Sequence, residues 1–221
     1  MSDQASPAYA APADPENALR AQHWGLLARL LVTAPDQTLL AGLAGLSGDD
    51  TPLGRAYEGL AAAAATTNPK AAADEFFALF IGVGRGELLP YASFYLTGFL
   101  NERPLADLRR DLAAMGVERQ AGRHEPEDHV ASLCEVMAGL AGGAFEASGL
   151  GCGGAGEAGF FARHLEPWAG HFFDDLGRAP SSSFYRAVAG IGRQLIEIEA
   201  RAFALARAAA GDASPATRAF A

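Results

Sequence analysis

The chain has 221 residues, is 50% hydrophobic and carries a formal net charge of −9, with 17 basic side chains against 26 acidic ones. An acidic surface repels phosphate backbones, so this balance argues against nucleic acid as a partner and favours a basic one. The two cysteines, Cys134 and Cys152, are too few for a disulfide framework or for a zinc site of four cysteines.

No stretch of the sequence approaches the ~20 uninterrupted apolar residues of a membrane-spanning helix. The tail of residues 1–14 is rich in Ala, Pro and Ser, and it lacks the basic and then apolar pattern of a signal peptide. We therefore expect a disordered tail and a cytoplasmic protein that makes no stable insertion into a membrane.

Helix start signals recur in the N-terminal part of the chain. Each has a capping side chain, and most add a proline at the first helical position, where its missing N–H is not needed. In chain order the signals are Asp14-Pro15, Asp36, Thr51-Pro52 and Asn68-Pro69. Apolar residues follow each signal at helical spacing, which predicts a helix after each one. For the first helix the predicted apolar face is Leu19, His23, Leu26, Leu27, Leu30 and Leu31.

The run 82–86, Gly-Val-Gly-Arg-Gly, is predicted to end the helix that follows Asn68, because glycine tolerates the positive φ that such a stop needs. Further helices are expected to begin at Pro104 and at Pro126, the second of them long. The aromatic stretch 160–173 predicts one more helix, and a last helix is expected from about residue 182 onward. Since no stretch alternates convincingly with period two, we predict an all-α protein, a compact bundle of roughly eight to ten helices.

The polar segment 118–125 lacks apolar periodicity and is predicted to be a hinge. It would join an N-terminal helical lobe, 15–117, to a C-terminal helical lobe, 126–221, within one domain overall. Such a hinge would permit domain swapping, so the sequence is compatible with a monomer and with a swapped dimer.

The glycine run also bears a superficial likeness to a phosphate-binding loop. A dinucleotide fingerprint needs a strand before the glycines and a helix directly after them. Here a helix is predicted before the run, Pro90 follows closely, and no Gly-Lys-Ser/Thr occurs. A helix stop is therefore favoured, and nucleotide binding is left as the alternative.

The segment 124–129, His-Glu-Pro-Glu-Asp-His, is predicted to form the first turn of the long helix. Carboxylates stabilise that position because the helix dipole is positive there. The alternative is a metal site, through His124 and His129 or through His164 and His171. The first pair spans a proline and need not share a helix face, and the phenylalanines around the second pair indicate packing.

No catalytic nucleophile stands out in the sequence. Ser93 lies near no predicted His or Asp, Cys134 faces a helix interior, and Cys152 falls in a glycine-rich stretch. The pair Arg109-Arg110 falls within a helix and is interpreted as a solvated face, not as an export signal.

The aromatic helix before the glycine run admits two interpretations. Phe76, Leu79 and Phe80 share one helical stripe, whereas Phe77 points about 100° away from it. More aromatic residues follow at 91–95 than a single buried stripe can hide. A core is favoured for the stripe, and an apolar groove for a partner peptide is the alternative use of the surplus.

Two motifs, in this order, resemble those of the TorD/DmsD/NarJ family of cytoplasmic chaperones for molybdoenzymes. The first comprises Glu75, Phe76, Phe77, Leu79, Phe80, Gly82, Pro90, Ser93 and Tyr95. The second comprises Glu125, Pro126, Asp128 and His129, with Glu135 later on the same helix. A looser third match consists of Phe161, His164, Leu165, Pro167, Trp168 and the Phe184-Tyr185 pair. The resemblance covers most of the chain after residue 70.

The resemblance implies an all-helical chaperone, not an enzyme, that binds the twin-arginine signal peptide of a molybdoenzyme precursor and assists folding and cofactor insertion before export. The peptide-binding residues that it implies are Phe76, Phe77, Leu79, Phe80, Pro90, Ser93, Tyr95, Glu125, Pro126, Glu127, Asp128 and His129. Their carboxylates suit arginine guanidinium groups, and the aromatic helix suits an apolar peptide segment.

The resemblance does not choose the client, which could be a formate dehydrogenase, a dimethyl sulfoxide or trimethylamine oxide reductase, or a nitrate reductase subunit. We expect no resident metal or cofactor, and weak binding of GTP or of the molybdenum cofactor is left open. Two other functions are also open. A helical metal- or nucleotide-dependent hydrolase predicts bound metal, or GTP turnover that depends on Asp128 or His129. A helical interaction module unrelated to export predicts indifference to twin-arginine peptides.

Overall fold

The computed structural model describes residues 14–118, 125–144 and 156–212, and every regular element within those ranges is a helix. In chain order the helices are α1 (Pro15–Val32), α2 (Gln37–Ala44), α3 (Pro52–Thr66), α4 (Pro69–Phe76), the π-helix η1 (Phe77–Ile81), α5 (Ala92–Thr97), α6 (Arg103–Ala114), α7 (Val130–Ala141), α8 (Gly156–His164), α9 (Ala169–Arg178) and α10 (Phe184–Asp212). The all-α prediction is confirmed. None of these helices combines the length and the apolar character that a membrane crossing requires.

The predicted tail 1–14, except its last residue, lies outside the described residues, and so do His124, Cys152 and most of the predicted hinge. The predictions made for them stay predictions.

All the predicted start signals of the N-terminal part begin a helix, and each capping side chain accepts an N–H of the first turn. The pairs are Asp14 with Glu16, Asp36 with Leu39, Thr51 with Gly54 and Asn68 with Ala71, at distances of 3.2, 2.8, 3.0 and 2.9 Å. These contacts satisfy N–H groups that lack an intrahelical partner. The local sequence therefore sets where α1 to α4 begin.

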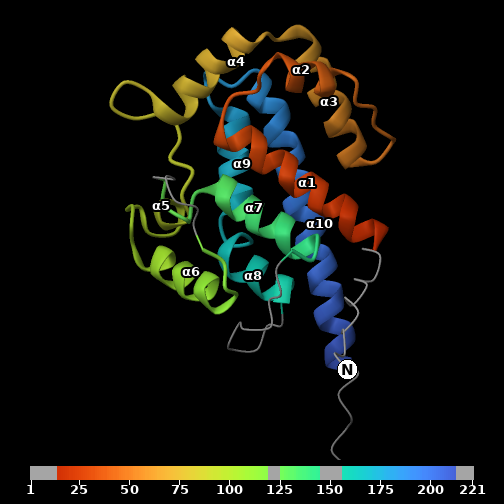
Figure 1. The fold of residues 1–221 in the computed structure, drawn as a ribbon, viewed down its shortest axis with the longest axis vertical. Helices are drawn as coiled ribbons and strands as arrows, with labels where there is room; N and C mark the ends of the chain where they lie inside the picture. The colour runs from red at the N-terminus through yellow and green to blue at the C-terminus, as the bar shows by residue number, and fades with distance from the viewer. Residues whose placement is uncertain (1–13, 119–124, 145–155, 213–221) are drawn as a thin grey trace, which may run out of the picture.

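The core lies between α1, α7, α9 and α10. α7 lies along α1, and α10 packs against both α9 and α3 (Figure 1). The buried side chains form one hydrophobic cluster, with members from both sides of the segment 118–125. Its largest members include Trp24, Trp168 and Tyr185. The helices α5 and α6, with the chain that leads into them, lie at one side of this frame (Figure 1).

The buried face of α1 differs from the predicted one. Trp24 is fully buried together with Leu27 and Leu31, whereas Leu19 is exposed. The three buried residues lie at i, i+3 and i+7 and share a face, and Leu19 lies about 140° around the helix from Trp24. The burial of Trp24 was missed because a buried indole needs an acceptor for its N–H. That acceptor is Glu199, which is distant in sequence and whose Oε1 lies 3.2 Å from Trp24 Nε1.

The aromatic stretch predicted as one helix forms two, α8 and α9. The turn between them contains Pro167, which cannot continue a helix because it lacks an N–H. The residues predicted to face inward do so, and these are Phe160, Phe161, Leu165, Trp168, Phe172 and Phe173. The single helix was therefore wrong, although its buried face was right.

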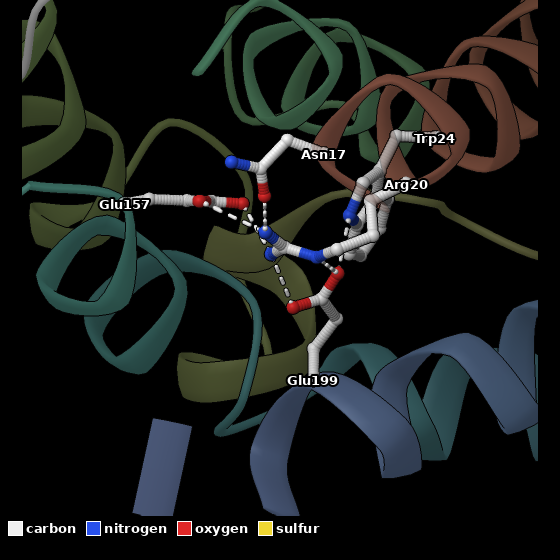
Figure 2. A network of polar contacts seen from close by, with 5 residues as sticks. All are labelled: Asn17, Arg20, Trp24, Glu157 and Glu199. Carbon is white, nitrogen blue, oxygen red and sulfur yellow. Dashed lines mark hydrogen bonds and ion pairs between the residues drawn. The ribbon is translucent and has the colours of Figure 1, made fainter. Parts of the chain in front are cut away.

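An ionic network ties α1 to α8 and α10 (Figure 2). Arg20 of α1 donates through Nε and Nη2 to the two oxygens of Glu199, at 2.9 and 2.6 Å. It also donates to Glu157 of α8, at 2.5 and 3.3 Å, and to Asn17, at 3.0 Å. The Trp24 indole N–H completes the network on Glu199. Three helices that are distant in sequence are thereby fixed to one another.

Candidate functional site

The backbone segments 90–92 and 128–130 pair with each other, which brings the two sequence motifs together. Two hydrogen bonds join them, one from the Val130 N–H at 2.8 Å and one from the Ala92 N–H at 3.0 Å. A single antiparallel bridge lies between these bonds. We refer to this pairing as the motif junction, and it is the candidate site.

The pairing places the start of α7 at Val130 and not at Pro126, where it was predicted. His129 has an extended backbone, with φ −64° and ψ 136°, and its Nδ1 accepts the N–H of Ala131 at 3.1 Å. His129 is therefore the N-cap of α7, and the acidic residues before it lie in a turn outside the helix. The local start signal at Pro126 is overridden by the pairing with a distant segment, which spacing along the sequence does not reveal. We call residues 125–129 the acidic turn.

Asp128 is 1% exposed and holds the start of α5. Its Oδ2 accepts the N–H of Ser93, in the first turn of α5, at 2.9 Å. The expectation that Ser93 lies near no Asp was wrong, because the two residues meet across 35 positions of sequence. Ser93 Oγ and Asp128 Oδ1 are buried, and neither has a hydrogen-bond partner within the described ranges. In this conformation the Asp128 carboxylate caps α5 from inside the fold.

The aromatic part of the junction is Tyr91 against His129. Their rings meet edge to face, with centroids 5.2 Å apart and planes at 76°. The Tyr91 hydroxyl donates to the carboxylate of Glu125. Burial raises the pKa of Tyr91 and lowers the pKa of His129 to about 4, so both side chains are neutral at pH 7. Tyr91 was not among the predicted site residues, although its place directly after the proline of the first motif could have indicated it.

The carboxylate of Glu127 forms an ion pair with Arg109 of α6. Nε and Nη2 of Arg109 lie 2.9 and 2.8 Å from Glu127 Oε2. Arg110 donates instead to Asp107 of its own helix, at 2.6 Å. Both arginines are exposed, as predicted for a solvated face, but Arg109 is also bound to the acidic turn. Sequence reasoning missed this contact because 18 positions separate its partners.

The aromatic helix buries or half-buries most of its predicted binding residues. Leu79 is fully buried, and the rings of Phe76 and Phe80 contact Tyr185 of α10, with centroids 5.9 and 5.5 Å away. Phe77 is 45% exposed. The core interpretation is therefore right for the stripe, and Phe77 is the aromatic residue that it leaves outside.

Phe77 opens an exposed apolar surface, and sequence reasoning missed its other members, Ile81 and Val83. It begins the π-helix, whose last wide turn is closed by the N–H of Gly82 on the Phe77 carbonyl at 2.7 Å. Ile81 is also exposed, and Val83 is 98% exposed. π-Helical turns occur frequently at functional sites. We call Phe77, Ile81 and Val83 the apolar turn, and the β-branched residues on either side of Gly82 were the signal that could have found it.

The glycine run ends the helix, as predicted. Gly82 has a φ of 62°, and a Cβ at this position would lie 2.0 Å from the Arg85 carbonyl oxygen. Another residue would therefore be strained there. The N–H groups of Glu87 and Leu88 donate back to carbonyls of the π-helix, at 3.1 and 2.9 Å. The loop thus uses these N–H groups to close on the helix before it.

The remaining residues of the first motif anchor α5 from inside. Pro90 is buried, and the Tyr95 hydroxyl donates to Asp175 of α9 at 3.1 Å. The Tyr95 ring contacts Trp168 and Phe172, with centroids 5.3 and 6.0 Å away. These contacts fix α5, and with it one half of the motif junction, against α9.

A cavity of about 180 Å³ opens between α5, α6, α7 and α8. Its walls are Ala92, Leu96, Pro104, Asp107, Leu108, Leu133, Arg163 and His164. His164 Nε2 lies 2.7 Å from Asp111 Oδ2, and burial lowers the pKa of His164. His164 is therefore a buried, hydrogen-bonded side chain at the edge of the cavity, whereas His171 is exposed on α9. Within the described part of the chain, no three His, Cys, Asp or Glu side chains form a group that could hold a metal ion.

We expect acid to destabilise the protein through His129. Its folded-state pKa of about 4 lies below the ordinary 6.5, so protonation favours unfolding and stability is lost as the pH falls below 6.5. Between about pH 7 and about pH 5 the expected loss is about 2 kcal/mol. Urea unfolding of the wild type and of His129→Asn at both pH values measures it. Asparagine can cap α7 without titrating, so an equal loss in both proteins would contradict the assignment.

Both motifs lie in the part of the chain that matches a known protein family. Residues 47–174, more than half of the chain, match the family described as nitrate reductase delta subunit. A protein named chaperone protein TorD from Vibrio cholerae is 31% identical over 129 residues, which is 57% of this chain and 59% of that protein. The chaperone protein TorD of Aliivibrio fischeri is 35% identical over 68 residues, 30% of this chain and 32% of that protein. The chain thus spans less than two thirds of the length of these relatives.

Proposed function

Because this chain belongs to the nitrate reductase delta subunit family, we propose that it is a chaperone for the maturation of a molybdoenzyme and not an enzyme. Its similarity to proteins named chaperone protein TorD supports this proposal. The main structural support for this proposal is the motif junction, because backbone pairing joins the two motifs of the resemblance into one site. The chaperone would act in the cytoplasm, on a precursor that has not yet been exported.

The acidic turn is the proposed site for the arginine pair of the precursor's signal peptide. Glu125 is exposed, and Glu127 reaches the surface beside Arg109. Carboxylates match the planar fork of a guanidinium, and the net charge of −9 favours a basic peptide. Asp128 and His129 are engaged in hydrogen bonds that fix this turn, so their proposed role in binding is to position it.

The apolar turn is the proposed surface for the apolar part of the same peptide. Phe77 and its exposed neighbours present it, while Phe76, Leu79 and Phe80 support it from the core. In Figure 1 the end of α4 and the helix α5 lie on the same side of the molecule, joined by the chain 87–91. An apolar peptide segment can lay one helical face on such a surface.

Titration calorimetry with a synthetic peptide that carries an Arg-Arg pair and an apolar stretch, beside a Lys-Lys version, tests this function. We expect tighter binding of the arginine peptide, weakened by salt because the contacts are ionic. Glu127→Gln should weaken it about tenfold, since it removes a charged acceptor. Glu197→Gln, which removes the same charge from an exposed pair with Arg201, should change it less than about twofold. Absence of binding to arginine peptides from several client classes, or equal loss in both variants, would contradict the proposal.

A further inference from the structure

Arg109 already holds one of the carboxylates that the proposed function offers to a client arginine. Its Nε and Nη2 lie 2.9 and 2.8 Å from Glu127 Oε2. The Glu127 side chain is 16% exposed, whereas the Arg109 side chain is 54% exposed. A second guanidinium that approaches Glu127 from solvent therefore competes with Arg109 for the same carboxylate.

The neighbouring Arg110 is a natural control for this contact. It donates to Asp107 of its own helix at 2.6 Å, and its side chain is 73% exposed. Successive side chains on a helix point about 100° apart, which separates the two arginines in space. They have the same charge and neighbouring positions, yet it is Arg109 that contacts the acidic turn.

We propose that Arg109 is an internal competitor for the arginine of the client peptide, and that it sets the affinity of the site. This inference rests on the proposed function and assigns the regulation of the same site. A peptide arginine exchanges one guanidinium–carboxylate contact for another, so the observed affinity is lowered by the fraction of molecules in which Arg109 holds Glu127. The displaced Arg109 side chain is already half in solvent, so it can swing out and remain hydrated.

The competition lowers the apparent affinity of an arginine peptide and of a lysine peptide by the same factor, because that factor is the fraction of molecules in which Arg109 leaves Glu127 free. A guanidinium presents a planar fork that can replace the contact of Arg109, whereas an ammonium is a compact, strongly hydrated point charge. A lysine peptide therefore displaces Arg109 less effectively than an arginine peptide does. That preference belongs to the carboxylate and the guanidinium themselves, so it persists without Arg109, which limits affinity and does not supply specificity.

Titration calorimetry of Arg109→Ala and Arg110→Ala with the synthetic Arg-Arg and Lys-Lys peptides tests the inference. Both variants remove one positive charge from α6, so the general attraction to a basic peptide rises in both. We expect Arg109→Ala to bind the Arg-Arg peptide about three- to tenfold more tightly than Arg110→Ala does. The Lys-Lys peptide should tighten by the same factor, so the ratio of Arg-Arg to Lys-Lys affinity should stay the same in Arg109→Ala. Arg109→Gln, which keeps a polar side chain there, should behave like Arg109→Ala.

The outcomes separate this inference from the proposed function. If the wild type binds the Arg-Arg peptide but Arg109→Ala binds it no more tightly than Arg110→Ala, the inference is overturned and the function stands. If the wild type binds the Arg-Arg peptide and Arg109→Ala binds it more tightly than Arg110→Ala does, both are supported. If neither the wild type nor any variant binds, the proposed function fails and the inference fails with it.

Discussion

Replacing Arg20 with leucine should lower the free energy of unfolding by about 3–5 kcal/mol, because it leaves a buried carboxylate without its cation. Arg20 holds both oxygens of Glu199, whose side chain is 1% exposed (Figure 2). In the variant, Glu199 keeps the indole N–H of Trp24 as a donor, which cannot balance a full negative charge. Glu157 is more exposed, so water can solvate it, and most of the loss is expected to come from Glu199.

Urea unfolding measures this loss, and a double variant identifies its cause. Arg20→Leu/Glu199→Leu removes the buried charge as well as its partner and should recover most of the stability. Arg201→Leu breaks an exposed pair on the same helix α10 and should cost less than about 1 kcal/mol. A double variant as unstable as the single one would show that packing, such as the contact of the guanidinium with the Phe203 ring at 5.5 Å, causes the loss instead.

The elements that depend on neighbouring residues were predictable from the sequence, and those that depend on distant residues were not. Asp36 and Asn68 each accept the N–H of the residue three positions later, so the local spacing alone contains the information. The partners Arg20 and Glu199 are separated by 179 positions, and nothing beside either residue indicates the other. The predicted start of α7 was wrong for the same reason, because pairing with a distant segment holds His129 outside the helix.

The same distinction between local and distant contacts applies to the candidate site. The resemblance selected Asp128 and His129, but it did not show that both turn inward to cap helices. The ion pair of Arg109 and the exposure of Val83 were missed, because the exposed face of a helix or turn depends on what packs against it. Residue types thus indicated which segments form the site, whereas tertiary contacts determine which of their side chains can meet a ligand.

The glutamate of the first motif illustrates a motif residue with a structural role. Glu75, at the end of α4, accepts the N–H groups of Ser183 and Tyr185 on Oε1, each at 2.7 Å, and that of Phe184 on Oε2 at 3.0 Å. These N–H groups belong to the start of α10, where they have no intrahelical partner and where the helix dipole favours a negative charge. Glu75 is therefore a remote cap that joins α4 to α10.

Glu75→Ala should lower the free energy of unfolding by about 2–3 kcal/mol, since several N–H groups lose a charged acceptor that water replaces in part. Glu75→Gln keeps one acceptor oxygen and should lose about half as much. Glu87→Ala is the matched control, because Glu87 accepts the Ser181 N–H at 3.3 Å in the exposed turn before α10. Its loss should stay below about 1 kcal/mol. Urea unfolding of the three variants beside the wild type measures these differences.

Peptide titration then separates a cap from a direct contact with the client. A cap predicts that Glu75→Ala unfolds at lower urea with an unchanged dependence on urea concentration, while the folded protein binds the Arg-Arg peptide as the wild type does. A peptide contact predicts the reverse, unchanged stability and weakened binding, because the carboxylate would then matter only when the peptide is present. Wild-type stability in Glu75→Ala would therefore contradict the cap, and weakened peptide binding by that variant would place the first motif's glutamate on the binding surface.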